Sequence, residues 1–552
     1  MPLRIVIVGG VGAGAGAATR ARRLDEQAEI ILFERSGYVS FANCGLPYYL
    51  GNIIADRGKL LVQSPEMFRK RFRIDVRVRH EVTAIDRSGK RVQVSDLNAG
   101  TSRWEPYDRL ILCPGACPIV PPIEGADATN VFTLRNMEDT DAIYGCLAKQ
   151  DAHTAAIVGA GFIGLEVADA LTRRGIRVQL VERLGQVLAP LDADMTGPIE
   201  RHLREKGVTP HLGNGLKALT VENGRATHVG LDDGTRIEAD MVLLAIGVRP
   251  ETRLAADTGL ALGPRGGIRV DEFLRTSDPD IFAAGDAVEV VHAVTGVPAL
   301  IPLAGPANKH GRLAGEIAVT GRPRRAARVV GTAIVKVFDL AAGLTGLSVK
   351  AAAQAGIETR HCIVQRPNHA TYYPGATMMT IKIVYRPADR RLLGVQIVGR
   401  DGVDRRLDVA ATVLHFGGTI DDLADLDLAY APQFGSAKDP LNIAAFVAQN
   451  QEDGLGRHVD PAEVERLRAE GWQLVDLRTA AEYAGGTIPG AVNIALDELR
   501  SSASQIAGDR PVLVFCQVGQ RGYVGARILQ NLGRTDVVNL AGGYSWYASQ
   551  KR

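Results

Sequence analysis

Two cysteines lie in sequence contexts that suit redox or sulfur chemistry, and the first of them is Cys44. It stands between Asn43 and Gly45 in the run SFANCGLP, and no second cysteine lies a few residues away. Backbone amides and a helix dipole at such a constrained turn can favour the thiolate, so we expect a lowered pKa for this thiol. A single thiol cannot close an internal dithiol–disulfide pair, and it would instead cycle through a mixed disulfide with a small thiol.

The second cysteine, Cys516, opens the loop CQVGQR between an apolar run at 511–515 and a predicted helix. Successive amides of such a loop would form a nest for an anion, and Arg521 would add positive charge. Both features suit a thiolate or a persulfide. The other cysteines have no histidine or carboxylate neighbour at metal-ligand spacing, so we expect no metal site. They are Cys113, Cys117, Cys146 and Cys362.

A glycine-rich turn near the N-terminus could hold the pyrophosphate of a dinucleotide. A β-branched run at 5–8 precedes it, a helix is predicted over 17–23, and a strand over 29–33 ends at Glu34. Strand, turn, helix, strand and terminal carboxylate make a dinucleotide-binding βαβ unit. Val11 occupies the place of the second glycine of G-x-G-x-x-G, which weakens the match. The candidate binding glycines are Gly9, Gly10, Gly12 and Gly14.

A second copy of this motif matches the pattern fully. An apolar run at 155–158 leads into GAGFIG, a helix is predicted to follow, and a strand ends at Glu182. The glycines allow a tight turn and close approach of amides to a pyrophosphate at the helix N-terminus. Glu182 would accept from the ribose 2′-hydroxyl, which favours NADH, while the adjacent Arg183 leaves NADPH open. The glycines are Gly159, Gly161 and Gly164.

A third stretch fits a flavin. In TSDPDIFAAGD, a turn and a short apolar strand precede Gly285 and Asp286. In flavoproteins a carboxylate after such a strand accepts hydrogen bonds from the ribityl chain of FAD, so Asp286 is a candidate flavin-binding residue. Two dinucleotide motifs in one chain suggest two cofactors that act in series.

The composition is that of a folded protein with several domains. The 552 residues suggest three to four domains, and 46% hydrophobic with 23% charged residues is ordinary. With 64 Lys and Arg against 62 Asp and Glu, the chain has no basic excess for nucleic acid. No uncharged stretch reaches the ~20 residues that span a bilayer, and we interpret the apolar N-terminus as a nucleotide-binding strand, not a signal peptide. Scattered cysteines favour a cytoplasmic protein.

Residues 1–450 resemble coenzyme A-disulfide reductases, the single-cysteine branch of the flavin-dependent pyridine nucleotide–disulfide reductases. The motifs that carry this resemblance are SFANCGLPYY, GAGFIGLE, IFAAGD, IPLAGPANKHGR and YAPQFGSAKDPLN. The remaining C-terminal residues resemble a rhodanese domain in VDLRTAAEY, GTIPGAVNI, VFCQVGQRG and LAGGYSWY. Thr487 departs from the rhodanese pattern, because a histidine usually precedes Ile-Pro-Gly. That position is structural in rhodaneses, so catalysis at Cys516 is not put in doubt.

The resemblance implies roles for residues that spacing alone does not assign. It implies FAD in the first motif, NAD(P)H in the second and Cys44 as the redox-active thiol. It also implies a homodimer in which Tyr372 and Tyr430 reach the partner subunit's active site, although the adjacent Tyr373 leaves the first of these ambiguous. The positions that match coenzyme A-binding residues of the family are Ser40, Asn43, Asn308 and Lys438. Arg20 and Arg23 lie where the nucleotide end of coenzyme A needs positive charge, and a solvated helix face formed by Arg20, Arg22 and Arg23 is the open alternative.

We therefore predict an α/β protein with two Rossmann-like dinucleotide-binding domains, an α+β dimerisation domain and a small α/β rhodanese domain. The predicted FAD-binding domain comprises 1–150 and 251–325, and the NAD(P)H-binding domain comprises 151–250. The dimerisation domain is predicted at 326–450, a linker at 451–458 and the rhodanese domain at 459–552.

The predicted activity is reduction of coenzyme A persulfide, polysulfide or coenzyme A disulfide by NAD(P)H, with sulfur transfer at Cys516. The rhodanese-like part moves the preference from plain disulfide reduction towards persulfide reduction. Two alternatives stay open. One is a flavin NADH oxidase or peroxidase in which Cys44 forms a sulfenic acid, although Tyr430 and Lys438 speak for coenzyme A. The other is a non-catalytic redox-sensing or sulfur-carrier protein.

Overall fold

The computed structural model describes residues 2–148, 152–508 and 510–550. They fold into two compact units. The first consists of Met1–Leu188 with Leu203–Gly331, and the second consists of Ala189–His202 with Thr332–Arg552. Parallel and antiparallel sheets alternate with helices in both units, which confirms the predicted α/β class. The domain boundaries proposed from the sequence stay predictions.

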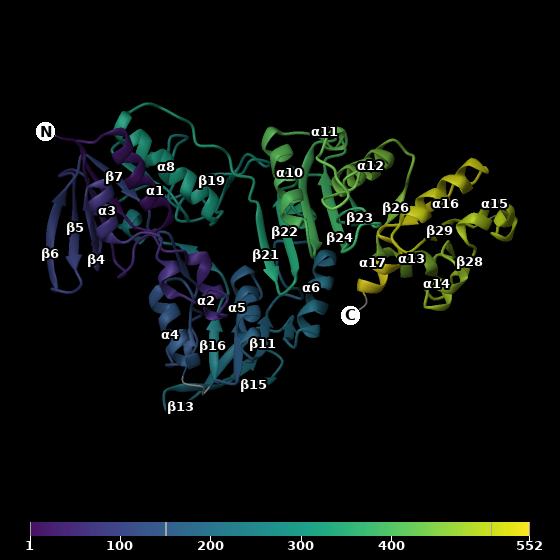
Figure 1. Cartoon of the computed structure of the whole chain (residues 1–552), viewed down its shortest axis with the longest axis horizontal. Coiled ribbons are helices and arrows are strands. Elements are labelled where there is room, and N and C mark those ends of the chain that lie inside the picture. Colours follow the sequence, from purple (N-terminus) through teal and green to yellow (C-terminus); the bar gives the residue numbers. More distant parts are fainter. Residues whose placement is uncertain (1, 149–151, 509, 551–552) are drawn as a thin grey trace. The chain divides into compact units, whose positions relative to one another are not determined.

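The N-terminal part of the first unit is built on a five-stranded sheet with the order β18-β7-β1-β2-β3 (Figure 1). Ile5 and Ile7 of β1 pack with the alanines of α1, while Val6 packs with strands β4 and β5 on the opposite face. The sheet is therefore covered on both sides, which explains its nearly continuous apolar strands. The elements are β1 (Arg4–Val8), β2 (Glu29–Glu34), β3 (Asp75–Val78), β7 (Arg109–Leu112), β18 (Ile281–Ala283), α1 (Gly12–Leu24), α3 (Pro65–Phe72), β4 (His80–Asp86), β5 (Arg91–Asp96) and β6 (Thr101–Pro106).

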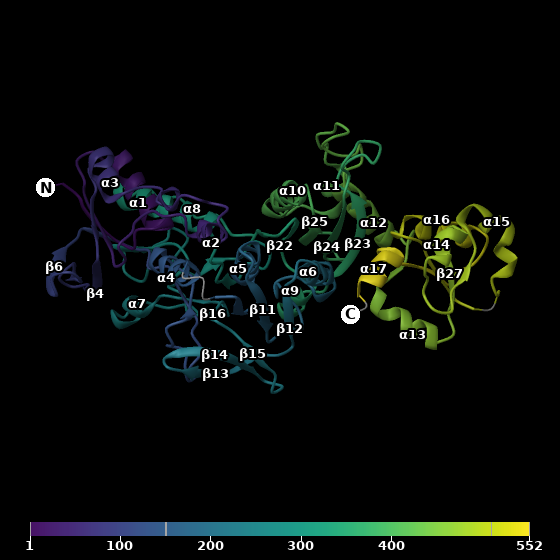
Figure 2. The ribbon, with the colours of Figure 1, turned by 60° about the horizontal axis from the view of Figure 1, so that its bottom comes forward.

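A second parallel sheet, with the order β12-β11-β10-β16-β9, repeats this arrangement. Strand β10 is buried at all of its residues, and its register with β11 pairs Val158 with Val181. Beside this sheet lies the small antiparallel sheet β13-β14-β15 (Figure 2). The elements are β9 (Val131–Phe132), β10 (Thr154–Val158), β11 (Arg177–Glu182), β12 (Thr209–Leu212), β16 (Met241–Leu244), α2 (Leu46–Leu50), α4 (Met137–Ala148), α5 (Phe162–Arg173), β13 (Leu216–Glu222), β14 (Arg225–Leu231) and β15 (Arg236–Glu238).

Helix α1 begins five residues before the predicted start, at Gly12 rather than Ala17. The helix crosses α8 (Ala304–Thr320), and the two helices lie side by side in Figures 1 and 2. A Cβ on Gly311 of α8 would stand 2.1 Å from the carbonyl oxygen of Ala13. Glycine has a low helix propensity, and that led to the later predicted start. Close packing between the helices outweighs this propensity.

The middle of the second unit is an antiparallel sheet with the order β21-β22-β25-β24-β23. Every residue of β25 is buried, since α10 packs on this sheet. The elements are α6 (Ala193–Glu205), β21 (Ala333–Val337), β22 (Leu340–Gly346), α9 (Val349–Gln354), β23 (Arg360–Pro367), β24 (Met378–Tyr385), β25 (Leu392–Gly399), α10 (Val403–Phe416), α11 (Ile420–Asp425) and α12 (Pro440–Glu452).

The C-terminal part of the second unit is a parallel sheet with the order β26-β30-β29-β27-β28. Two apolar clusters cover its two faces, as a small α/β domain requires. Because α12 continues to Glu452 and β26 starts at His458, only 453–457 of the predicted linker lies outside regular elements. The elements are β26 (His458–Val459), α13 (Val464–Ala469), β27 (Gln473–Asp476), α14 (Ala480–Ala484), β28 (Val492–Asn493), β29 (Val512–Phe515), α16 (Gln520–Asn531), β30 (Val537–Leu540) and α17 (Gly543–Gln550).

Candidate active site

The first glycine-rich turn joins β1 to α1, and backbone contacts exclude side chains from it. Gly9 has a φ of +93°, and a Cβ there would stand 2.1 Å from the Cys113 carbonyl oxygen. A Cβ on Gly14 would stand 1.8 Å from the carbonyl oxygen of Gly9. The Glu34 carboxylate accepts from the amide of Gly10 at 2.8 Å and from the amide of Ser36 at 2.9 Å. Any residue other than glycine would therefore clash with the backbone at Gly9 and at Gly14.

The second turn, between β10 and α5, has the same close backbone contacts and the same carboxylate hydrogen bonds. A Cβ on Gly164 would stand 1.9 Å from the carbonyl oxygen of Gly159, whose φ is +108°. The Glu182 carboxylate accepts from the amides of Ala160 and Leu184 at 2.8 and 2.9 Å. Gly161, with open space around its Cβ direction, is the residue that precedes the helix.

The two turns show how the first motif departs from the usual glycine pattern. Val11 precedes α1 as Gly161 precedes α5, so Val11 occupies the place of the second glycine, as the sequence predicts. Gly12, with a Cβ direction 3.4 Å from the Asn308 side-chain nitrogen, lies one residue further, inside the helix. Both turns leave helix N-terminal amides free for a pyrophosphate.

Asp286 lies close to the first turn, since a Cβ on the preceding Gly285 would stand 3.1 Å from the Cβ of Ala13. Burial raises the pKa of the Asp286 carboxyl, and Arg135 opposes this shift. Within the described residues, no side chain or amide donates a hydrogen bond to this carboxylate. A half-buried acceptor without a protein donor suits a hydroxyl of the FAD ribityl chain, and the residues of this region therefore fit FAD.

Cys44 lies in a single turn of 3-10 helix, Asn43–Gly45, that runs directly into α2. The Cys44 amide donates to the Asn43 side-chain oxygen at 3.1 Å. The expected lowering of its pKa is wrong, because partial desolvation, followed by the charges of Glu166 and Asp286, raises the pKa of the thiol. The five-residue α2 and the thiol's own backbone amide do not outweigh these effects.

Glu166 of α5 and Tyr48 of α2 connect the Cys44 turn to the second nucleotide turn. The Tyr48 hydroxyl donates to the Glu166 carboxylate at 2.8 Å, and burial raises the pKa of Glu166. The helices approach closely at Gly51, where a Cβ would stand 3.0 Å from the Cα of Ala170. Sequence reasoning missed this pair, although Tyr48 lies in the motif SFANCGLPYY and Glu166 lies in the motif GAGFIGLE.

Ser40 and Asn308, two of the predicted coenzyme A-binding residues, both lie at the first turn. The amide of Ser40 donates to the Gly10 carbonyl at 2.8 Å, and Ser40 has a φ of +48°. The Asn308 side chain donates to the Ala304 carbonyl at 2.9 Å. Lys438, by contrast, belongs to the second unit, where it is exposed just before α12.

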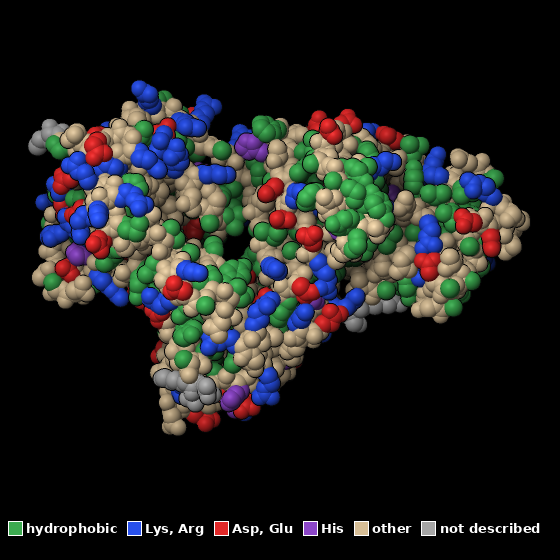
Figure 3. All heavy atoms as spheres, viewed as in Figure 1, with side chains coloured by type: hydrophobic (Ala, Val, Ile, Leu, Met, Phe, Trp, Pro, Cys, Tyr) green, Lys and Arg blue, Asp and Glu red, His purple; other side chains and the backbone are tan. Residues whose placement is uncertain are grey.

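The three arginines on α1 have three different environments. Arg20 donates two hydrogen bonds, of 3.0 and 2.6 Å, to Glu316, so its charge is already paired. Arg22 is only 6% exposed and donates to four backbone carbonyls, so a solvated face formed by all three arginines is wrong. Arg23 is exposed and remains a candidate for the nucleotide end of coenzyme A. Lysine and arginine side chains gather around this part of the surface in Figure 3.

In the second unit, the hydroxyls of Tyr372 and Tyr430 lie 2.9 Å apart, and this hydrogen bond raises the pKa of Tyr372. The two tyrosines are 74% and 48% exposed. Tyr373 turns to His369 instead, with the ring centroids 5.7 Å apart at 79°. The pairing of Tyr372 with Tyr430 favours Tyr372 over Tyr373 as the active-site tyrosine.

Cys516 lies at the end of β29 and is 1% exposed. Gly519 precedes α16 with a φ of +93°. In the described chain, no amide from Gln517 to Gly522 donates to a protein acceptor. Six unpaired amides after a buried cysteine agree with the predicted anion nest.

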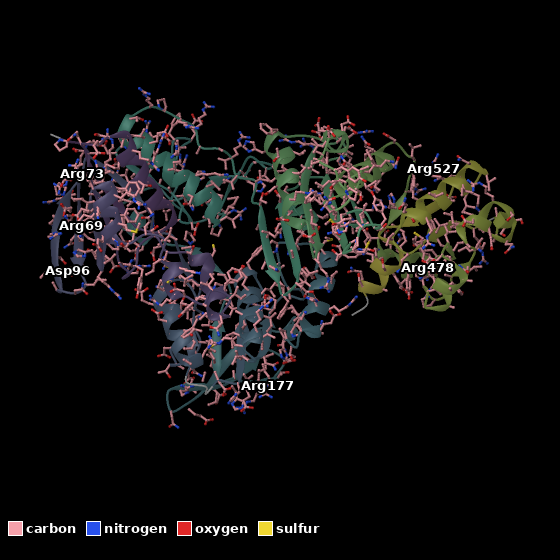
Figure 4. The ribbon with its side chains drawn as sticks, viewed as in Figure 1. Arg69, Arg73, Asp96, Arg177, Arg478 and Arg527 are labelled. Carbon is pink, nitrogen blue, oxygen red and sulfur yellow. The ribbon has the colours of Figure 1, made fainter. Side chains whose placement is uncertain are left out.

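Arginine side chains around this loop are partly neutralised. Arg521 donates to both oxygens of Glu482, at 2.8 and 2.6 Å, and this interaction, with a smaller one to Cys516, raises the pKa of Arg521. Arg478, labelled in Figure 4, forms a buried ion pair with Asp476 at 2.7 Å. Thr487 donates to the same Asp476 at 2.8 Å, which gives this departure from the rhodanese pattern a structural role.

The remaining cysteines have varied surroundings. Burial raises the pKa of Cys113 to about 12 and also raises that of Cys362. Cys117 donates to Glu251 at 2.8 Å. No group of three or more metal-binding side chains occurs within residues 2–148, 152–508 and 510–550. Across the same residues, every helix is too short or too polar to cross a membrane.

Comparison with protein families agrees with this geometry. Residues 3–307 match the pyridine nucleotide-disulphide oxidoreductase family, and residues 332–440 match the dimerisation domain of pyridine nucleotide-disulphide oxidoreductases. Residues 460–550 match the rhodanese-like domain. The three matches follow the order that the sequence motifs predict.

Known proteins resemble the chain over most or all of its length. A coenzyme A disulfide reductase of Staphylococcus haemolyticus is 33% identical over 447 residues, which cover 81% of this chain and 99% of that protein. The crystal structure of reduced Bacillus anthracis CoADR-RHD is 44% identical, with a TM-score of 0.96, and the match covers 100% of this chain and 98% of that one. A NAD-dependent persulfide reductase from A. fulgidus is 36% identical, with a TM-score of 0.94, and the match covers 99% and 100%. Two equivalent glycine-rich turns, an exposed Cys44 beside the first of them and these matches show that the chain belongs to the pyridine nucleotide-disulphide oxidoreductase family and carries a rhodanese-like domain.

Proposed function

We propose that the chain is an FAD-dependent enzyme that uses NAD(P)H to reduce coenzyme A persulfide, polysulfide or coenzyme A disulfide through Cys44. One observation carries the proposal: Cys44 is the only exposed cysteine of the six, and it has no cysteine neighbour in its turn. Hydrogen bonds tie that turn to the first nucleotide turn at Gly10 and to helix α5 at Glu166. The named activities of the relatives support the same chemistry.

The first turn is proposed to hold FAD and the second to hold NAD(P)H. Bound FAD supplies two-electron transfer between the nicotinamide and sulfur. The chain's own part is to hold each pyrophosphate on helix N-terminal amides and each adenosine ribose near a carboxylate, Glu34 or Glu182. Asp286 would accept from the ribityl chain. The FAD-binding set is Gly9, Gly10, Gly12, Gly14, Glu34 and Asp286, and the NAD(P)H-binding set is Gly159, Gly161, Gly164 and Glu182.

Cys44 acts as the nucleophile. Its thiolate attacks the sulfur–sulfur bond of the substrate, forms a mixed disulfide and releases hydrosulfide or a thiol. Two electrons from the nicotinamide nucleotide then break the mixed disulfide and regenerate the thiolate. Since the pKa of Cys44 is raised, the free enzyme holds mostly the thiol at neutral pH, and deprotonation is part of the cycle. Ser40, Asn43, Asn308, Arg20 and Arg23 are proposed to contact coenzyme A. Of these, Arg20 already forms an ion pair with Glu316.

Replacing Cys44 with serine tests this role. The Cys44→Ser variant is expected to retain FAD, because no proposed FAD contact uses the thiol. Its reduction of coenzyme A disulfide and persulfide by NADH is expected to fall by at least roughly a hundredfold, since a serine hydroxyl is a far weaker nucleophile. If the serine variant binds FAD but no longer oxidises NADH in the presence of these substrates, the mechanism is supported. Turnover by this variant near that of the wild type contradicts it.

We also propose a homodimer whose active site is completed by the partner subunit. The match to a dimerisation domain and the exposed hydroxyl pair of Tyr372 and Tyr430 support this. Lys438, exposed in the same unit, is proposed to reach coenzyme A. Mixing Cys44→Ser with Tyr430→Phe chains tests the arrangement, because heterodimers would regain one complete site only if each site uses both subunits.

The rhodanese-like part is proposed to transfer sulfane sulfur through Cys516, with Arg521 and the loop amides holding the persulfide. The small thiols, coenzyme A and nicotinamide nucleotides that the enzyme uses are cytoplasmic, and six free thiols agree with a cytoplasmic location, which we propose. Oxygen uptake distinguishes the NADH oxidase or peroxidase alternative. NADH-dependent oxygen consumption faster than disulfide and persulfide reduction would favour that alternative.

A further inference from the structure

Strand β23 of the second unit contacts the Cys516 loop directly. Arg366 donates to the side-chain oxygen of Gln520 at 2.7 Å. One residue earlier, Gln365 is hydrogen-bonded to the Ser545 hydroxyl at 2.5 Å, and Ser545 in turn donates to the Gln517 carbonyl at 2.7 Å. Two positions of the loop that follows Cys516 are therefore braced by a strand outside the rhodanese-like residues 460–550.

In the described part of the chain, two of the three arginines that contact the loop are paired with carboxylates and one, Arg366, is not. Arg478, which reaches Gln517 at 3.1 Å, is paired with Asp476, and Arg521 is paired with Glu482. Arg366 has no carboxylate within 4.0 Å among the described residues, and burial lowers its pKa. A half-buried guanidinium that donates to the neutral amide of Gln520 keeps further donors for an oxyanion.

The position of Arg366 matters because Cys516 is 1% exposed while Gln520 is exposed. A sulfur donor can offer only its terminal sulfur to so buried a thiol. The rest of the donor must stay near the exposed residues of the loop, where Arg366 binds Gln520. Planar guanidinium groups match phosphate and sulfonate oxygens with paired hydrogen bonds.

We propose that Arg366, a residue of the dimerisation domain, binds the oxyanion of the sulfur donor at the Cys516 loop, so that the sulfur-transfer site is composite. The inference rests on the proposed sulfur transfer at Cys516 and adds a binding residue and a donor class to it. The oxyanion is either the sulfonate of thiosulfate or a phosphate of coenzyme A persulfide. Gln365 and Ser545 hold the strand and the loop in register for this contact.

The transfer step itself is balanced within the donor and the cysteine. The Cys516 thiolate attacks the outer sulfur of the donor, and the new sulfur–sulfur bond forms as the donor's own breaks. The electron pair of the broken bond leaves with sulfite or with the coenzyme A thiolate. Cyanide, as assay acceptor, then takes the outer sulfur as thiocyanate and returns the Cys516 thiolate.

The test uses the full-length protein and three donors: thiosulfate, coenzyme A persulfide and pantetheine persulfide. The last two share one thiol arm and differ in the phosphorylated nucleotide. Arg366→Gln is expected to lower kcat/KM by about tenfold or more for at least one oxyanion donor, mainly through KM, because a charged hydrogen bond is lost. Pantetheine persulfide is expected to change less than about twofold. Arg366→Lys, which keeps the charge, is expected to recover part of the loss.

Arg360→Gln is the matched control, since Arg360 lies on the same strand but is paired with Glu452 at 2.9 Å. A loss with thiosulfate alone identifies the sulfonate as the ligand, and a loss with coenzyme A persulfide alone identifies the phosphate; either supports the proposal. An equal loss of kcat/KM with all three donors overturns the proposal, because Arg366 would then only support the structure of the loop. No loss with any donor also overturns it, because Arg366 would then have no role in donor binding. A different result would show that the proposed sulfur transfer at Cys516 is itself wrong: the wild type and the Cys516→Ser variant would then transfer sulfur at equal rates.

Discussion

At the scale of single residues, Glu34 and Glu182 occupy equivalent positions in the two glycine-rich turns. Glu34 and Glu182 each accept from two backbone amides, one in the glycine turn and one after the strand. These bonds hold the carboxylate where an adenosine ribose would lie. Each carboxylate oxygen keeps a second lone pair for a ribose hydroxyl.

Glu182→Ala is expected to weaken NADH binding and to reduce the preference for NADH over NADPH. The carboxylate both accepts from the ribose and repels a 2′-phosphate, so its loss removes an attraction for one nucleotide and a repulsion for the other. Steady-state kcat/KM for both nucleotides measures the ratio, which should narrow by roughly tenfold. Glu182→Gln, which can still accept from the amide of Ala160, separates the charge from the support of the turn. An unchanged ratio in both variants means that Glu182 does not contact the ribose.

The thiol of Cys44 gives a prediction about pH. Its pKa is raised by desolvation and by the nearby charges of Glu166 and Asp286, so the reactive thiolate increases as the pH rises above the usual range for cysteine. Glu166→Gln removes one negative charge and keeps an acceptor for Tyr48, so the pKa should fall. Alkylation of Cys44 by iodoacetamide is then expected to be faster at neutral pH, with the midpoint of its pH profile shifted down. A midpoint that stays or rises would show that the charge of Glu166 does not act on the thiol.

At the scale of elements, the crossing of α1 with α8 sets the geometry of the first nucleotide turn. Gly311 and Gly315 of α8 face the backbone of Ala13 and Ala17, with Cβ directions 2.1 and 2.4 Å from their carbonyl oxygens. The same helix carries Asn308 next to Gly12. Close contact between the helices therefore places a proposed coenzyme A-binding residue beside the proposed FAD turn.

Gly311→Ala is expected to destabilise the protein by about 1–3 kcal/mol, because the new methyl group overlaps a backbone carbonyl that cannot rotate away. The displaced α1 should also bind FAD more weakly. Gly305→Ala on the same helix is the control, since nothing lies within 4 Å of its Cβ direction and alanine is the better helix former. Urea unfolding and the flavin content of the purified protein measure both effects. Equal stability of the two variants would rule out the crossing as the constraint.

At the scale of the whole molecule, the two cysteine centres belong to different units. Cys44 lies in the first unit and Cys516 in the second, and each is supported by its own sheet and loop. The α12-to-β26 segment joins the rhodanese-like part to the dimerisation domain, and Arg366 and Gln365 add direct contacts. Substitution of one cysteine is therefore expected to remove the chemistry at that centre and to leave the chemistry at the other centre.

Cys516→Ser is expected to abolish sulfur transfer from thiosulfate to cyanide, because the loop then holds no sulfur nucleophile. NADH-dependent reduction of coenzyme A disulfide, which needs only Cys44 and the cofactors, is expected to remain within about twofold of the wild type. Reduction of polysulfide should fall most, and that of coenzyme A persulfide should fall between these limits. An equal loss on all three substrates would mean that the loop is needed for folding, and no loss on any would mean that the two centres work separately.

Much of this protein could be predicted from its sequence, because the motifs are local. The strand, turn and carboxylate of each nucleotide-binding unit span about thirty residues, and the structure has both with the predicted strand ends at Glu34 and Glu182. The α/β class and the turn around Cys44 were equally accessible from the sequence. The start of α1 was missed because its glycines are tolerated only through contact with a distant helix.

The sequence by itself therefore determined the order of the domains, the two glycine-rich turns and the local setting of the two candidate cysteines, Cys44 and Cys516, since those features depend on neighbours within a few residues. Only the tertiary structure decided what surrounds them. It pairs Tyr48 with Glu166, Arg20 with Glu316 and Arg366 with Gln520, residues far apart in the chain. It also raises the pKa of Cys44, which local spacing suggested would be lowered. The reason is physical. The burial of a side chain, the charges around it and its hydrogen-bond partners depend on how distant elements pack together, and these cannot be read from spacing along the chain.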